Sequence, residues 1–160
     1  MVSYFSKMAD SSIKKKLLST LQAILENNSK ETRLALEFAK ESRDNETKST
    51  AGDKYETGRA MADIEVQKLD MQLAKHKQML SDIQRIASLP SGSGKAVQGS
   101  LIRTDSGWYF LALAMGRLQV EGKEVAVISP FSPLGQAFGG VKPGDEVVFQ
   151  GRTMRILEVE

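Results

Sequence analysis

The sequence contains no cysteine, which excludes disulfide bonds and zinc–thiolate sites. It also contains no uninterrupted apolar run of about 18 residues, so no transmembrane helix is expected. The net charge of +2 is too small to indicate a chain that wraps nucleic acid directly. Residues 1–10 lack the apolar segment of a signal peptide. These absences together favour a cytoplasmic protein.

Proline and glycine are nearly missing from the first half of the chain. Residues 11–88 hold no proline and only two of the 13 glycines, Gly52 and Gly58, whereas all four prolines come later. Pro90 and the glycines and serines that follow it predict a linker over residues 89–95.

The domain organisation follows from this contrast. We expect a flexible leader over residues 1–10, a helical domain over 11–88 and a second domain over 96–160. The helical domain is rich in Glu, Lys, Ala, Leu, Gln and Met, which are all good helix formers.

Apolar residues in the helical domain recur at alternating spacings of four and three, the heptad pattern of a coiled coil. The second helix carries this pattern through Ala62, Val66, Leu69, Leu73, His76, Leu80, Ile83 and Ala87. The first carries it through Leu17, Leu21, Ile24, Asn28, Glu31, Ala35 and Phe38. Neither helix can bury its stripe alone, so an antiparallel coiled-coil hairpin is expected.

Three further expectations concern the polar residues of these helices. Asp10, Ser11 or Ser12 is expected to cap the first helix. His76, the only histidine, is expected to fix the register opposite Ile24 to Asn28 and not to bind a metal. The run Lys14-Lys15-Lys16 is expected to be a solvated helix start.

The hairpin should turn near residues 44–58. Residues 44–53 lack large apolar groups and are rich in turn and cap formers. Asp53 and Glu56 then lie three residues apart at the start of the second helix, where they share one face. Such a pair can hold Mg²⁺ together with water, or it can be an N-cap with its capping-box partner; both roles are compatible.

The last 65 residues predict a small α+β domain of short strands and one helix. Strands are expected over residues 97–104, 108–115, 116–120, 125–129, 146–150 and 153–159, with a helix over 134–138. Its core is expected to hold Trp108, Phe110, Phe131, Phe138 and Phe149.

Two stretches resemble the Gre transcript-cleavage factors of bacterial transcription. One is Gly52-Asp53-Lys54-Tyr55-Glu56-Thr57-Gly58, similar to the family's tip pattern. The other, more specific, runs from Ile128 through Ser132-Pro133-Leu134-Gly135 to Gly144-Asp145-Glu146-Val147. The resemblance implies an N-terminal antiparallel coiled-coil hairpin and a C-terminal FKBP-like domain.

The resemblance also implies a function. The hairpin would enter the secondary channel of RNA polymerase, with the RNA 3′ end an indirect partner. Asp53 and Glu56 would help to hold a second Mg²⁺ and a water, so that the polymerase cleaves backtracked RNA by two-metal chemistry. Lys54 and Tyr55 would contact the polymerase or RNA, and Ser132 and Pro133 would contact the polymerase rim. The chain would be a monomer with no cofactor of its own and no membrane association, and it would not itself be an enzyme.

Three alternatives stay open at this point. The residues after Glu56 (Thr57-Gly58-Arg59-Ala60) depart from the family pattern, and matching Tyr55 to the family's tyrosine would put Lys48 and Ala51 at the acidic positions. The chain could then be a secondary-channel regulator that does not stimulate cleavage. Ser132 and Pro133 could form only a structural turn. An FKBP-like prolyl isomerase or chaperone is disfavoured, because Trp108-Tyr109-Phe110 must alternate faces along a strand.

Overall fold

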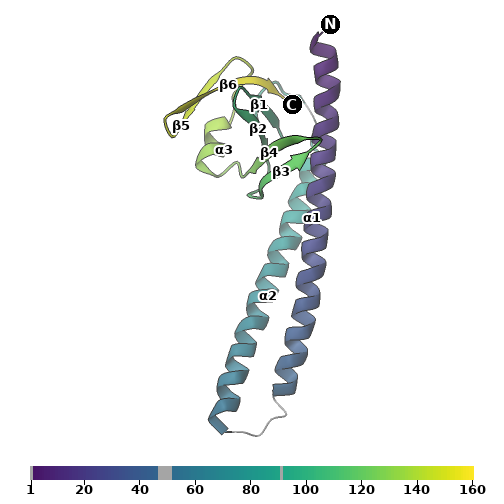
Figure 1. The fold of residues 1–160 in the computed structure, drawn as a ribbon, viewed down its shortest axis with the longest axis vertical. Helices are drawn as coiled ribbons and strands as arrows, with labels where there is room; N and C mark the ends of the chain where they lie inside the picture. The colour runs from purple at the N-terminus through teal and green to yellow at the C-terminus, as the bar shows by residue number, and fades with distance from the viewer. Residues whose placement is uncertain (1, 47–51, 91) are drawn as a thin grey trace. The chain divides into compact units, whose positions relative to one another are not determined.

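The computed structural model describes residues 2–46, 52–90 and 92–160, without the side chains of residues 2–11, 46 and 52–55. The chain is α+β, with two long packed helices that form a hairpin and then a six-stranded mixed sheet (Figure 1). None of the helices in the described ranges is both long enough and apolar enough to cross a membrane.

The hairpin consists of two helices longer than the average helix of a globular protein. Their bounds are α1, Val2–Glu46, and α2, Gly52–Ala87. Because α1 begins at Val2, it includes most of the predicted leader, and Asp10, Ser11 and Ser12 are not its N-cap. Residues 2–10 contain no proline or glycine that would stop a helix, which explains the extension.

The helix–helix seam agrees with the heptad pattern on α2 except at Ala87, which is exposed while Ile86 is buried, and agrees only partly on α1. Val66, Leu73 and Ile83 of α2 are buried as expected. On α1 the buried row departs from the predicted row after Leu21. The buried residues of α1 are Ile13, Leu17, Leu21, Leu25, Ser29, Thr32 and Leu36. The prediction was therefore wrong for Glu31, Ala35 and Phe38, which are exposed.

The physical reason lies in the spacing of the α1 row. The first five buried residues follow one another at intervals of four, so the row drifts around the helix relative to a strict heptad repeat. By the middle of the helix it has moved from the leucine-rich stripe onto Ser29 and Thr32. The exposed side chains Leu34 (57 %) and Phe38 (72 %) are left outside.

The sheet has the strand order β3-β4-β2-β1-β6-β5. Only β2 and β4 pair in parallel, and the other neighbours are antiparallel. The strands are β1 (Leu101–Thr104), β2 (Gly107–Leu111), β3 (Gly116–Val120), β4 (Lys123–Ile128), β5 (Glu146–Phe149) and β6 (Arg152–Val159). All six fall within or beside the predicted strand positions.

Three hairpins in the sheet close through two-residue turns, and two of these turns have the same left-handed geometry. Val120 pairs with Lys123, and Phe149 pairs with Arg152. In both turns the two central residues have positive φ: Glu121 (53°) and Gly122 (74°), Gln150 (49°) and Gly151 (75°). This geometry matches the right-handed twist of the paired strands.

The short helix α3 (Pro133–Phe138) covers one face of the sheet. Phe138 is fully buried there in a cluster with Ala96, Ile102, Leu111, Val147, Met154 and Ile156. Phe110 is also fully buried and Phe149 packs against the cluster, as predicted. Phe131 was expected in the core, but its side chain is 82 % exposed.

The chain divides into two compact units. One comprises Met1–Leu21 and Asp82–Glu160, and the other comprises Gln22–Ser81. The first unit thus contains the sheet, the ends of both long helices and the predicted linker at residues 89–95. Within it, Gly99 lies against the end of α2, since a Cβ at Gly99 would be 3.1 Å from Ile86 Cγ2.

Candidate functional site

The predicted tip lies where α1 ends at Glu46 and α2 begins at Gly52. Asp53 and Glu56 are therefore the second and fifth residues of α2. The Glu56 side chain is exposed. The side chains of Asp53, Lys54 and Tyr55 lie outside the described residues, so their predicted roles stay predictions.

The acidic residues beside the tip contribute to the hairpin itself. Arg43 contacts Asp44 (Nε to Oδ1, 3.3 Å) and reaches across to Asp63 of α2 (Nη1 to Oδ1, 3.8 Å). Lys40 and Asp70 form a further pair between the helices at 3.8 Å. In the part of the chain that the structure describes, no three histidine or acidic side chains cluster closely enough to hold a metal ion.

His76 lies on the seam of α2 but not opposite the predicted segment. Its Nδ1 is 3.2 Å from Thr32 Oγ1, one turn beyond Asn28 on α1. Thr32 is buried and His76 half-buried. The contact places a hydrogen-bonded polar pair inside an otherwise apolar interface, which is the typical structural role of such residues in coiled coils.

The loop before α3 is held by a dense set of hydrogen bonds. Ser132 is the N-cap of α3, and its Oγ accepts from the Gly135 N–H at 3.1 Å and donates to the Ser129 carbonyl at 2.6 Å. The Phe131 N–H donates to Ser129 Oγ at 3.2 Å. Gln136 Nε2 donates to the Phe131 carbonyl at 3.1 Å.

These contacts show that Ser132 and Pro133 both have structural roles. Ser132 satisfies donors at the start of α3, and Pro133 occupies the first turn, where its fixed φ suits a helix and its missing N–H is not needed. The structural interpretation of these two residues is therefore confirmed. Pro133 is also exposed, so its predicted partner contact is compatible with that duty.

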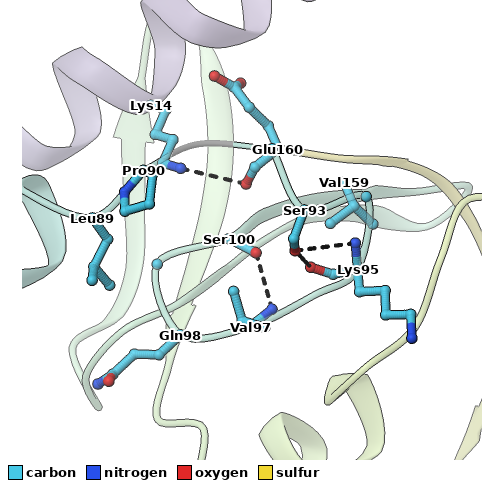
Figure 2. A pocket seen from close by; sticks show the side chains of 13 residues that line it. Lys14, Leu89, Pro90, Ser93, Lys95, Val97, Gln98, Ser100, Val159 and Glu160 are labelled. Carbon is cyan, nitrogen blue, oxygen red and sulfur yellow. Dashed lines mark hydrogen bonds between the residues drawn. The ribbon is translucent and has the colours of Figure 1, made fainter.

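A cavity of about 240 Å³ lies in the first unit, lined by Lys14 of α1, by residues 89–90, 92–95 and 97–100, and by Val159 and Glu160 (Figure 2). Lys14 Nζ donates to the Glu160 carbonyl at 3.5 Å. Burial lowers the pKa of Lys14, and the Glu160 carboxylate opposes this shift. Lys14 is thus half-buried, contrary to the expected solvated run, whereas its neighbour Lys15 is exposed.

The polar groups of the cavity mainly hold its own wall together. Ser93 Oγ donates to the Lys95 carbonyl at 2.9 Å, and the Val97 N–H donates to Ser100 Oγ at 3.0 Å (Figure 2). None of the described residues that line it is aromatic. The cavity therefore lacks the aromatic lining that a prolyl-isomerase site would need.

The three consecutive aromatic residues of β2 take separate environments, as the strand alternation predicted. Trp108 was expected in the core but is only half-buried, and its ring faces two cations, with Lys123 Nζ at 4.7 Å and Arg103 Cζ at 5.8 Å from its centroid. The Tyr109 ring packs on Phe138 at 4.8 Å between centroids. Phe110 is fully buried. These three side chains do not line a common pocket.

Among the residues near the loop before α3 and the cavity, sequence reasoning missed the exposure of Phe131 and the burial of Lys14. The sequence carried no signal for the first, because the uncharged stretch from Val125 to Val141 is as typical of a buried segment as of an exposed one. No local signal distinguishes Lys14 from Lys15.

Comparison with protein-family models found no match, and comparison with curated proteins found none either.

Proposed function

We propose that the chain binds bacterial RNA polymerase, enters its secondary channel with the end of the hairpin, and stimulates cleavage of backtracked RNA by the polymerase. The order of parts supports this proposal, since a long helical hairpin precedes an α+β sheet domain. The resemblance to Gre factors at Gly52–Gly58 and Ile128–Val147 supports it independently of the fold.

The observation that carries the proposal is the position of Asp53 and Glu56 along α2. Asp53 and Glu56 fall in the first turns of α2, at the end of the hairpin, three residues apart. Carboxylates near a helix N-terminus are stabilised by the helix dipole in their charged form. One or two of them suffice for Mg²⁺, which keeps several waters.

The chemistry would belong to the polymerase. Asp53 would supply an oxygen ligand to a Mg²⁺ shared with the polymerase active site, and Glu56 would be a second ligand or orient the attacking water. The metal would lower the pKa of that water and stabilise the charge that develops on the scissile phosphate. Lys54 and Tyr55 would contact the polymerase or RNA beside the metal, and Ser132 and Pro133 the polymerase rim.

A stalled, backtracked elongation complex tests this proposal directly. The wild-type chain should shorten the RNA from its 3′ end in a Mg²⁺-dependent reaction, and Asp53→Ala and Glu56→Ala should each lower the rate by at least about 100-fold. Both variants should still bind the polymerase. Asp44→Asn removes an acid near the same end that already contacts Arg43, and this control should cleave normally.

A second candidate is a secondary-channel regulator that binds without stimulating cleavage. The sequence after Glu56, Thr57-Gly58-Arg59-Ala60, favours it because it lacks the acid and tyrosine of the Gre pattern. In the same assay this candidate predicts polymerase binding with unchanged RNA. A change in nucleotide-addition rate would then measure its effect.

A further inference from the structure

Three consecutive lysines of α1 have three different environments. Lys14 is half-buried, and its Nζ donates to the Glu160 carbonyl at 3.5 Å. Lys15 is exposed. Lys16 is exposed as well and forms an ion pair with Glu121. Within one turn of the helix, one amine is thus partly removed from water while its two neighbours remain in water.

The Lys14 amine lies at the cavity of the first unit. The titratable groups among the described residues that line this cavity are Lys14, Lys95 and Glu160. Figure 2 shows the Lys14 amine pointing to the Glu160 carbonyl, whereas the Lys95 amine points away from Lys14. A small molecule in the cavity would therefore meet the amine of Lys14. The lining also includes four apolar side chains, those of Leu89, Pro90, Val97 and Val159.

This environment favours the reactive form of the amine. A lysine attacks a carbonyl carbon only when its amine is neutral, and removal from water favours the neutral form. Burial lowers the pKa of Lys14, and the Glu160 carboxylate opposes this shift. The neutral amine of Lys14 is therefore reached at a lower pH than that of an ordinary lysine. Because the side chain is only half-buried, it is still accessible to a reagent from solvent.

The size and lining of the cavity limit what the amine can accept. Its volume of about 240 Å³ falls below the range of about 300 to 1,000 Å³ that is typical of pockets for drug-sized molecules. A short acyl group of about two to four carbons fits such a space. Apolar walls favour a hydrocarbon chain, since its burial removes apolar surface from water.

We propose that Lys14 is an acylation site, at which the amine takes a short acyl group from a small activated acyl donor such as an acyl phosphate. The neutral Nζ attacks the carbonyl carbon of the donor and forms a C–N bond. The bond from that carbon to the phosphate oxygen breaks, and phosphate leaves with the electron pair. The proton that the nitrogen loses passes to water, and the product is an amide.

The amide suits the site better than the charged amine does. Acylation removes a positive charge whose partial burial is unfavourable. The amide keeps one N–H, which can still donate to the Glu160 carbonyl, and the acyl chain lies along the apolar lining. Acylation at Lys14 therefore stabilises the folded chain. This inference does not depend on the proposed function, because it involves neither RNA polymerase nor the end of the hairpin.

The first experiment compares the three lysines within one protein. The full-length chain is incubated with acetyl phosphate or, separately, with acetyl-coenzyme A at mildly alkaline pH. A protease that cuts after acidic residues releases residues 11–26, which contain all three lysines, and fragmentation in the mass spectrometer locates the added acetyl group. We expect Lys14 to be acetylated at least about threefold faster than Lys15, and Lys16 to be no faster than Lys15. The donor that gives the greater preference for Lys14 identifies the donor class.

The second experiment tests whether the acyl group lies in the cavity. Lys14→Arg keeps the positive charge but cannot be acylated, so the same treatment modifies only the other lysines. Acetyl phosphate should shift the urea midpoint of the wild type to a higher concentration, relative to the shift that it causes in Lys14→Arg. Acetylation of Lys14 no faster than that of Lys15 would overturn the proposal. So would equal midpoint shifts in the two proteins after Lys14 has been acetylated.

Discussion

Thr32 Oγ1 and His76 Nδ1 lie 3.2 Å apart and form a hydrogen bond between the two long helices. The pairs Lys40–Asp70 and Arg43–Asp63 continue the same antiparallel register toward the end of the hairpin. The hydrogen bond is the one of these contacts that lies at a buried seam position, Thr32 being 6 % exposed. It therefore specifies which turns of the helices face each other more strongly than the exposed ion pairs do.

We predict that this polar pair is coupled. Thr32→Val removes the partner of a half-buried imidazole and should lower the free energy of unfolding by about 0.5 to 1.5 kcal/mol. His76→Leu leaves the Thr32 hydroxyl buried without that partner and should cost a similar amount. The double variant restores an apolar seam and should be at least as stable as the wild type. Urea unfolding followed by circular dichroism measures the cycle, and simple additivity of the two losses would contradict the coupling.

Gly135 should be intolerant of any side chain. A Cβ at this position would overlap the Ser129 carbonyl oxygen, and backbone atoms cannot move aside as side chains do. We expect Gly135→Ala to lower the free energy of unfolding by about 2 to 4 kcal/mol. Gly139→Ala is the control, since its Cβ would lie 3.3 Å from the Gln136 carbonyl oxygen and should cost much less. Equal stability of the two variants would show that the loop is not rigid.

Lys14 should make stability depend on pH in the alkaline range. Burial lowers its pKa below the usual 10.5, so between the two values the unfolded chain binds more protons than the folded chain. Stability from this group therefore rises with pH across that window and is reduced below it. We expect Lys14→Met to be more stable than the wild type at neutral pH by less than about 1 kcal/mol, because the side chain is only half-buried.

The test for Lys14 is the direction in which the stability difference between Lys14→Met and the wild type changes with pH. The advantage of Lys14→Met should shrink as the pH approaches 10.5. Lys15→Met, which removes the positive charge of the exposed neighbouring lysine, is the matched control. Chemical denaturation of the three proteins from neutral pH upward compares them, and an advantage that grows with pH would contradict the assignment.

Gln150 is a position where the chain can be made more stable. Its φ of 49° lies in the left-handed region, which costs a non-glycine residue about 1 to 2 kcal/mol and costs asparagine less. We expect Gln150→Asn to raise the free energy of unfolding by about 0.5 to 1 kcal/mol. Glu121 has a similar φ of 53° but contacts Lys16, so Glu121→Asn should gain less. Thermal melting of both variants tests this ranking.

Much of the fold could be predicted from local sequence patterns. These patterns depend only on residues that are close together in the chain. They are the heptad spacing on α2, the absence of proline from the helical half, and the alternation along the strands. The strand positions, the short helix and the opposite faces of Trp108 and Tyr109 followed from these patterns. The start of α1 did not, because Asp10 and the serines after it are compatible with both a cap and a helix interior.

The sequence could predict where in the chain the candidate site residues lie, but not how their side chains are arranged in space. Gly52-Asp53 and Glu56 indicated the start of α2 to within a residue, but α2 begins at Gly52, so Asp53 lies inside the helix and is not its N-cap. Phe131 was placed in the core because aromatic residues are usually buried, whereas its ring is 82 % exposed, in a loop where Gly135 closely approaches the Ser129 carbonyl.

The sequence by itself determined the order and type of the elements, since helix periodicity, strand alternation and turn chemistry act over a few residues. Only the tertiary structure decided which faces meet. The drift of the α1 seam onto Thr32, the contact of Thr32 with His76 and the half-burial of Lys14 beside Glu160 all depend on residues far apart in the chain. Such contacts depend on how whole elements pack, and no short stretch of sequence encodes that packing.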